Sequence, residues 1–164
     1  TEEKTNLAEI YLKPMTPEMY HAYFKEYEND MALYLDKSEF YQYEYSPEKV
    51  NASIERQISK KRVTLAVMRD EEMIGEVKFV IAEDKQSAVL GISMKNDKYK
   101  NKGYGTKAES LAVTYVFDRL NIPVLYADVI VTNVRSWHVL EKVGFTLTGE
   151  DEKYRHYKIG KRGK

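Results

Sequence analysis

Residues 98–110 read KYKNKGYGTKAES, so three lysines precede Gly103 and Gly105 at the start of a helical pattern. Glycines at a helix start let a ligand approach the backbone closely, and the unpaired N–H groups of the first turn attract anions. The stretch therefore favours a loop that holds phosphates. A flexible turn whose lysines are merely solvated would give the same pattern, so the rest of the chain has to separate the two interpretations.

Gly103–Ala108 also satisfies the dinucleotide-binding pattern G-x-G-x-x-A. That pattern needs a strand running straight into the glycines, whereas the preceding strand ends near Met94 and polar or charged residues intervene. The acid that binds ribose should lie at a strand end, but Asp128 lies inside an apolar run. A nucleotide-dependent oxidoreductase is therefore only a minor alternative.

The composition suits one globular domain, residues 1–164, because 43% of the residues are hydrophobic. Lys+Arg and Asp+Glu balance at 26 each, so we expect no nucleic-acid partner. Cysteine is absent and there are three scattered histidines, which excludes thiolate catalysis and disfavours a metal site. Neither a membrane span nor a secretion signal is evident, so we expect a cytoplasmic protein without a membrane partner.

Strand and helix signals follow one another in the order β-α-α-β-β-β-α-β-α-β-β, which describes one layered α/β domain. Thr16 and Ser46 each precede Pro-Glu, a pattern typical of helix starts, and the second helix should run to about Lys61. Short polar connections between strands at 63–69, 73–82 and 88–94 indicate an antiparallel meander, and the apolar run 124–131 indicates a central strand. The other expected elements are strands at 8–15, 145–150 and 154–160, a helix after Gly105 and a helix from Asn133 to Gly144.

Two segments resemble the GNAT superfamily of N-acetyltransferases. Residues 91–112, GISMKNDKYKNKGYGTKAESLA, resemble the motif whose Gln/Arg-x-x-Gly-x-Gly/Ala loop grips the pyrophosphate of acetyl-CoA. Residues 127–145, ADVIVTNVRSWHVLEKVGF, resemble the strand, Asn-x-x-Ser/Ala and Glu-Lys-x-Gly-Phe that follow in this family. Both segments lie behind two helices and a three-strand meander, so the resemblance covers nearly the whole chain. It is nearest the branch of ribosomal-protein N-terminal and spermidine or diamine acetyltransferases.

The resemblance implies an α/β fold (α+β layered) with a mixed, mostly antiparallel central sheet and helices on both faces. It also implies acetyl-CoA as co-substrate and no metal. The acetyl-CoA-binding residues that it implies are Ile92, Met94, Lys100, Asn101, Lys102, Gly103, Tyr104, Gly105, Thr106 and Asn133. In the family the strand at 88–94 offers unpaired backbone N–H groups to the thioester, and Gly91 would allow a bulge that separates this strand from its neighbour.

Ser136 and Glu76 are the candidate catalytic residues. The family's matching Ser has been considered as a proton donor in this branch, and Glu76 could activate a water as a base. A first-turn helix position and a surface-facing strand acid are equally ordinary explanations of the two residues. The chain departs from the family at Lys100, which replaces Gln, Arg or Trp, and at Leu140, which replaces a Tyr often proposed as general acid. The donor of a proton to the leaving thiolate is therefore unassigned.

The expected activity is transfer of an acetyl group from acetyl-CoA to a primary amine, either a small cationic amine or a peptide N-terminus. The alternative is a non-catalytic acyl-CoA sensor on the same fold, and the missing tyrosine at Leu140 keeps it open. The segment 36–45, DKSEFYQYEY, belongs to the acceptor side in the family. Its aromatic rings either pack the two N-terminal helices or join its acids in attracting a cation. A homodimer is one option for the assembly.

Overall fold

The computed structural model describes residues 10–100 and 102–161, in which seven strands form one sheet in the order β1-β2-β3-β4-β5-β7-β6. The strands are β1 (Ile10–Pro14), β2 (Val63–Arg69), β3 (Glu72–Ile81), β4 (Ser87–Met94), β5 (Val124–Ile130), β6 (Thr146–Glu150) and β7 (Tyr154–Gly160). The α-helices are α2 (Pro17–Glu26), α3 (Pro47–Ser59), α4 (Tyr104–Thr114) and α5 (Val134–Val143). Within the described residues, β4 and β5 pair in parallel and the other neighbours pair antiparallel. The predicted meander and the interior position of β5 are confirmed.

The two N-terminal helices start where the sequence predicts. The Thr16 hydroxyl accepts a hydrogen bond from the Met19 N–H at 3.2 Å, and the Ser46 hydroxyl accepts one from the Lys49 N–H at 3.3 Å. In both helices a proline occupies the first turn, where its missing N–H costs no hydrogen bond. Side-chain caps and prolines thus fix both helix starts.

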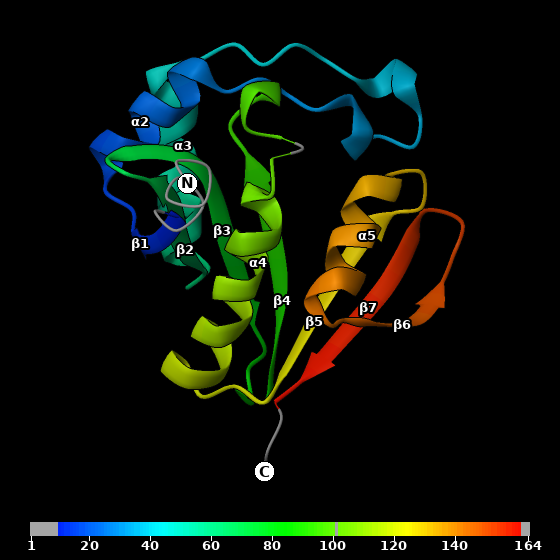
Figure 1. Ribbon diagram of the computed structural model, residues 1–164. Coiled ribbons are helices and arrows are strands. Elements are labelled where there is room, and N and C mark those ends of the chain that lie inside the picture. The colour runs from blue at the N-terminus through cyan, green and yellow to red at the C-terminus, as the bar shows by residue number, and fades with distance from the viewer. Residues whose placement is uncertain (1–9, 101, 162–164) are drawn as a thin grey trace, which may run out of the picture.

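Helices cover both faces of the sheet, as predicted (Figure 1). Successive residues of β2 point to opposite faces, so Ala66 and Met68 pack with Tyr20 and Tyr23 of α2. Val67 belongs instead to the larger core, which contains residues of α4 and α5. Each face therefore carries its own apolar cluster. Among the described residues, no helix combines the length and apolar character that a membrane span requires.

β4 and β5 separate after a short paired region, and this opening positions the site. They pair from Ser87–Val89 to Val124–Tyr126 and then diverge, which Figure 1 shows as a V that opens toward the top of the view. The bulge expected at Gly91 is wrong, because the register of β4 with β3 runs unbroken through that residue. The strands separate because β5 continues along β7 while β4 stays on β3.

Candidate functional site

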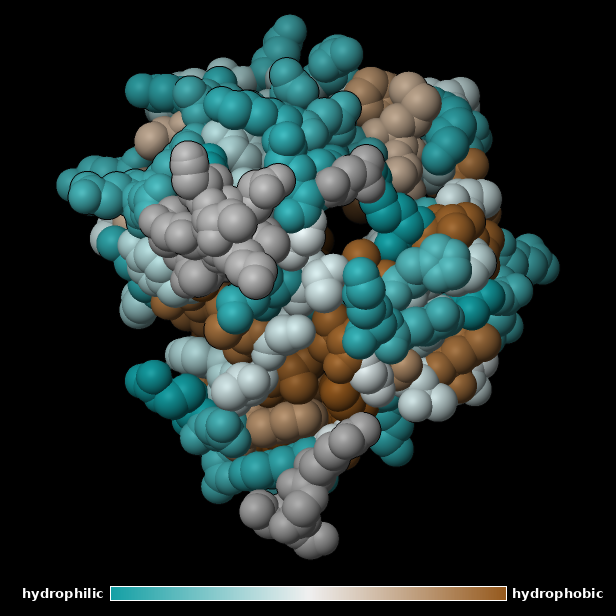
Figure 2. Space-filling model, viewed as in Figure 1, coloured by the Kyte–Doolittle hydropathy of each residue, from teal (hydrophilic) through white to brown (hydrophobic). Residues whose placement is uncertain are grey.

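A cleft of about 370 Å³ lies between the separated end of β4, the start of α4, the start of α5 and the chain that follows α2. The space-filling view shows a hollow in this region, beside the upper end of α4 (Figure 2). Eight residues that the sequence singled out meet here. They are Ile92, Met94, Lys100, Gly103, Gly105, Thr106, Asn133 and Ser136.

The backbone of β4 presents to this cleft N–H groups that have no partner in the part of the chain that the structure describes. The Lys95 N–H donates to the Ile74 carbonyl of β3 at 2.7 Å, so Met94 and its partner Gly75 form a pair without mutual hydrogen bonds. N–H groups alternate between the two edges of a strand, so Ile92 and Met94 direct theirs away from β3 and toward the space that β5 has left. Two donors on one edge suit a carbonyl oxygen that gains negative charge.

The start of α4 is built to receive an anion. Gly103 precedes it with φ of 83°, a left-handed conformation that favours glycine, and this N-cap residue has no side chain that could cap the helix. A Cβ placed on Gly105 would meet no atom of residues 10–100 and 102–161 within 4 Å, so these residues leave the space above the first turn open. Uncapped N–H groups and open space at a helix N-terminus suit a phosphate.

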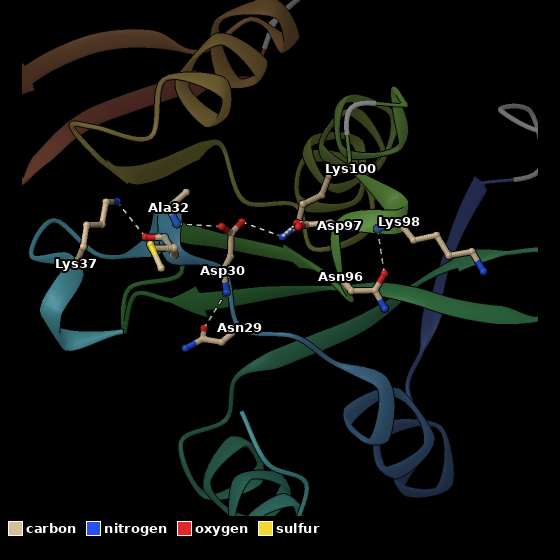
Figure 3. Close-up of polar contacts among 9 residues, drawn as sticks. Asn29, Asp30, Ala32, Lys37, Asn96, Asp97, Lys98 and Lys100 are labelled. Atoms are coloured by element: carbon tan, nitrogen blue, oxygen red, sulfur yellow. Dashed lines mark hydrogen bonds and ion pairs between the residues drawn. The ribbon is translucent and has the colours of Figure 1, made fainter. Parts of the chain in front are cut away.

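Lys100, one of the residues that the resemblance implies for acetyl-CoA binding, lines the cleft and is already paired within the protein. Its ammonium lies 2.9 Å from Asp30 Oδ2 and 3.1 Å from Asp97 Oδ1, so it ties the chain after α2 to the loop before α4 (Figure 3). Burial tends to raise the pKa of Asp30, but the hydrogen bonds from Lys100 and from the Ala32 N–H hold this pKa below its usual value. The charge of Lys100 is therefore already compensated by two carboxylates.

The other residues predicted around the glycines contribute less to the cleft. Lys102 is exposed and does not line it. The Tyr104 side chain is buried, and the Arg69 guanidinium lies 5.7 Å from the centre of its ring. Asn101 lies outside the described residues. What Tyr104 can offer a ligand is therefore its backbone.

The start of α5 supplies polar groups on the opposite wall. Asn133 occupies the N-cap position without making a side-chain capping hydrogen bond, and its side chain is half-buried. Ser136 lies one turn later and lines both this cleft and a second one between β4 and β5. Leu140 is 3% exposed and belongs to the larger core, with its side chain reaching only the second cleft.

Glu76 is not brought to the cleft, which corrects the idea that it acts there as a base. It lies on the face of β3 toward α2, level with Ala66 and Ser93, and it lines neither cleft between β4 and α5. It is also not surface-facing, because it is 6% exposed and its Oε1 lies 3.6 Å from Lys78 Nζ. Alternation along β3 directs this carboxylate to the α2 face.

Four charged or acidic residues of the cleft were missed from the sequence. Arg135 and Lys142 of α5 line it with positive charge, Asp30 lines it from the chain after α2, and Glu109 of α4 lines both clefts. A signal for Glu109 exists, because it shares a helical stripe with Gly105 and Ala112 at spacings of four and three residues. An acid on the buried stripe of a helix is a candidate for function.

The wall of the cleft that the chain after α2 forms is lined by Tyr27, Asp30 and Leu33, and no residue of segment 36–45 lines this cleft. Tyr43 of that segment packs against Phe24 and Tyr27, with ring centres 5.4 and 5.3 Å apart. Glu39 and Glu44 are exposed and line none of the clefts described here. Of the two interpretations of these aromatic residues, packing of the N-terminal helices is the one observed for Tyr43.

Residues 10–100 and 102–161 contain no group of three or more His, Cys, Asp or Glu side chains that could hold a metal ion. The candidate site thus consists of backbone donors on β4, an open helix start on α4, cationic groups on α5 and one buried carboxyl group.

The acetyltransferase (GNAT) domain model matches residues 9–146. Spermidine N(1)-acetyltransferase of Escherichia coli strain K12 is 40% identical over 53 residues, which are 32% of this chain and 28% of that protein. A chimera of Vibrio cholerae spermidine N-acetyltransferase and hSSAT superposes with a TM-score of 0.76 at 17% identity over 93% of this chain and 95% of that one. The Campylobacter jejuni N-acetyltransferase PseH gives a TM-score of 0.69 at 21% identity, over 93% and 98% of the two chains.

The two structural likenesses show the fold, while the family model covers most of the chain and includes every candidate site residue. The separated strands, the glycine-led helix and the Asn133 helix are arranged as the two motifs of the sequence imply. This chain belongs to the family of GNAT acetyltransferase domains.

Proposed function

We propose that this chain transfers the acetyl group of acetyl-CoA to a primary amine, either a small cationic amine or a protein N-terminus. The observation that carries the proposal is one continuous cleft that joins the open end of β4 to the uncapped start of α4. An acyl group held at the first place and a pyrophosphate held at the second match the two ends of this co-substrate.

The residues present fit acetyl-CoA. The space above Gly105 leaves room for a pyrophosphate against the first N–H groups of α4, and Arg135 and Lys142 add positive charge to the same cleft. The side chain of Asn133 makes no capping bond, so it is free to form a hydrogen bond with the amide-containing arm of acetyl-CoA. When bound, acetyl-CoA supplies the acetyl group as a reactive thioester.

The chain contributes mainly positioning and charge stabilisation. The N–H groups of Ile92 and Met94 are placed to donate hydrogen bonds to the carbonyl oxygen of the acetyl group as negative charge develops on it. Fixed donors in a cleft also hold the carbonyl carbon in one orientation for the incoming amine. Ser136, which lines both clefts, remains a candidate proton donor in this proposal.

The acceptor would enter between the chain after α2 and the end of β4. Tyr27 places an aromatic face there, and Asp30 and Asp97 carry two negative charges against the one positive charge of Lys100, so this wall attracts cations. The E. coli and V. cholerae proteins to which this chain is similar are named for spermidine, which supports a small cationic amine as the first class to test.

A non-catalytic acyl-CoA sensor is the second candidate, and the burial of Leu140 favours it. The family that the sequence resembles often has a tyrosine at this point, whereas here the apolar side chain of Leu140 belongs to the core. The two candidates differ in turnover and not in binding.

The test is a thermal-shift titration with acetyl-CoA, followed by measurement of coenzyme A release with a panel of amines. The panel contains spermidine, a neutral primary amine and a peptide with a free N-terminus. Stabilisation by acetyl-CoA together with amine-dependent release supports the transferase. Stabilisation without release from any amine supports the sensor, and a melting temperature unchanged by acetyl-CoA contradicts both.

A further inference from the structure

Glu109 is buried without a partner at the point where the two clefts meet. The residue is 3% exposed, and its Oε1 has no hydrogen-bond partner among residues 10–100 and 102–161. A buried carboxyl oxygen without a partner is costly, so its presence at a cleft calls for an explanation. Packing alone is a weak explanation. The buried positions beside Glu109 on α4 are Ala108 and Ala112, whose small apolar side chains need no hydrogen-bond partner.

The second cleft occupies the space from which β5 has withdrawn. Leu90 to Ile92 of β4 and Ala127 to Ile130 of β5 form its walls, and Glu109 closes it from α4. Ile92, Asn133, Ser136 and Glu109 line this cleft and the first one alike. Glu109 therefore shares both clefts with the Ile92 residue whose N–H faces the proposed thioester site.

The surroundings of Glu109 keep it protonated at neutral pH. Burial raises the pKa of its carboxyl group to about 8. The charged groups that line the same clefts come from the neighbouring elements. They are Asp30 and Lys100, which pair with each other, Arg135 and Lys142 of α5, and Asp128 of β5, which pairs with His156 at 2.6 Å.

We propose that Glu109 is the proton donor to the departing thiolate of coenzyme A, the role that Leu140 cannot fill. This inference rests on the proposed function. As the amine nitrogen bonds to the acetyl carbon, the carbon–sulfur bond breaks and its electron pair goes to sulfur. The sulfur takes the proton of the Glu109 carboxyl group, and the amine nitrogen loses one proton to solvent. A proton from solvent then restores Glu109, so the products are the amide and coenzyme A thiol.

A donor role fits this residue better than a base role. A general base must be ionised before reaction, whereas burial disfavours the ionised form of Glu109. A general acid works best when its pKa lies near the operating pH, and a thiol with a pKa of about 8.5 is a well-matched acceptor for such an acid. Ser136 lines the same clefts, but a hydroxyl is a much weaker acid.

The first test is the pH dependence of turnover in Glu109→Gln, a variant of nearly the same shape that has no acidic proton. We expect kcat to fall about 100-fold with the KM for acetyl-CoA nearly unchanged. The parent should lose kcat above about pH 8 as Glu109 ionises, and the variant should lack this decline. The exposed Glu55 of α3 gives a matched control, Glu55→Gln, which should keep the parent's profile. An unchanged kcat and profile in Glu109→Gln would overturn the donor role.

The second test needs no turnover and measures coenzyme A binding by calorimetry between pH 7 and pH 9.5. In the parent, the ionised carboxylate comes to face the coenzyme A sulfur, so affinity should fall about tenfold more across this range than in Glu109→Gln. The phosphates titrate equally in both proteins and cancel in the comparison. Equal pH dependence would place Glu109 away from the sulfur and would also overturn the proposal. Should the Gln variant fold poorly, Glu109→Leu gives the same comparison.

The results can contradict the proposed acetyltransferase function and the donor role of Glu109 separately. A parent protein that binds no coenzyme A, or that binds it but acetylates no amine, contradicts the proposed function and the donor role with it. A parent that acetylates amines while Glu109→Gln matches it in both tests contradicts the donor role alone.

Discussion

The two sides of the cleft hold their carboxyl groups in opposite states. On the α4 side, Glu109 is buried without a partner for Oε1, and burial raises its pKa to about 8. On the side formed by the chain after α2, Asp30 is partly exposed and its carboxylate receives hydrogen bonds from Lys100 and the Ala32 N–H, which hold its pKa below the usual value despite partial burial.

Paired acids whose surroundings separate their pKa values are a common sign of divided roles in an active site. Here the difference leaves a neutral carboxyl group, the proposed proton donor, beside the β4 edge and an ionised carboxylate near the proposed amine entrance. Both groups are carboxyl groups, so their environments and not their residue types separate them.

The largest expected effect is on the free energy of unfolding. Glu109 should make it fall as the pH rises, whereas Asp30 should make it rise. The folded protein holds the Glu109 proton up to about pH 8, whereas an unfolded chain loses it near 4.5, so stability falls as pH rises between these values. Glu109→Gln removes that loss. At about 1.4 kcal/mol per pKa unit, the variant should gain up to about 5 kcal/mol on the parent above pH 8 and almost nothing below pH 4.5.

Urea unfolding of the parent and of Glu109→Gln at pH 5, 7 and 8.5 measures this difference. Asp30→Asn is the contrasting variant. Because the pKa of Asp30 is lowered in the folded protein, its carboxylate stabilises the fold above the ordinary pKa of an aspartate, and this stabilisation is lost as the pH falls below that value. A gain in Glu109→Gln that stays constant with pH would mean that the carboxyl group is not held protonated.

The second effect concerns the α4 start alone. Gly105→Val fills open space, so the fold should be retained while the pyrophosphate loses its approach to the helix N–H groups. Losing about two charge-assisted hydrogen bonds should weaken acetyl-CoA binding about 100-fold. Calorimetry measures the affinity. Gly149→Val on the edge strand β6 is the matched control, since a Cβ there also meets nothing within 4 Å. Equal affinity in the two variants would remove α4 from the binding site.

The third effect concerns the contact between the two sides. The Asp30–Lys100 pair joins residues 70 positions apart in the chain, with side chains 27% and 12% exposed. Because solvent screens it and Asp97 also contacts Lys100, we expect a coupling energy of only about 0.5–1 kcal/mol. A double-mutant cycle with Asp30→Asn and Lys100→Met measures it by urea unfolding. A coupling near zero in low salt would show that the pair does not hold the chain after α2 in place.

How much the sequence could predict depends on how local each feature is. The caps at Thr16 and Ser46 and the glycine-led start of α4 are written in a few adjacent residues, so they were predicted correctly. The pairing of Lys100 with Asp30 depends on a contact between distant segments, which no local pattern reports. The Gly91 bulge failed because the opening arises from the different partners of β4 and β5, a property of the whole sheet.

Glu76 and Glu109 also show that local sequence does not predict which side chains reach a site. Glu76 was a candidate base because it lies in a strand of the meander. A strand has two faces, and the side chain of Glu76 lies on the face that packs against α2. Glu109 follows Ala108 in a helix rich in apolar residues, where a single acid gives no local sign of a site. Helical spacing is compatible with a buried position, but only the packing of α4 on the opening between β4 and β5 places Glu109 at a cleft.

The smallest expected effect is at segment 36–45, which contributes acids to neither side of the cleft. Glu39 and Glu44 are exposed, and among the described residues the chain after α2 lines the cleft with Tyr27, Asp30 and Leu33 instead. Charges on the surface are screened within about 8 Å at physiological salt, so the double variant Glu39→Gln, Glu44→Gln should change the KM for spermidine less than about twofold. Asp30→Asn, in contrast, removes a charge from the cleft itself and should raise this KM more than the double variant does. Initial rates over a range of spermidine concentrations at low and physiological salt give both values. If the double variant raises the KM for spermidine more than Asp30→Asn does, most strongly at low salt, then segment 36–45 binds the acceptor. Asp30 would then have no part in acceptor binding.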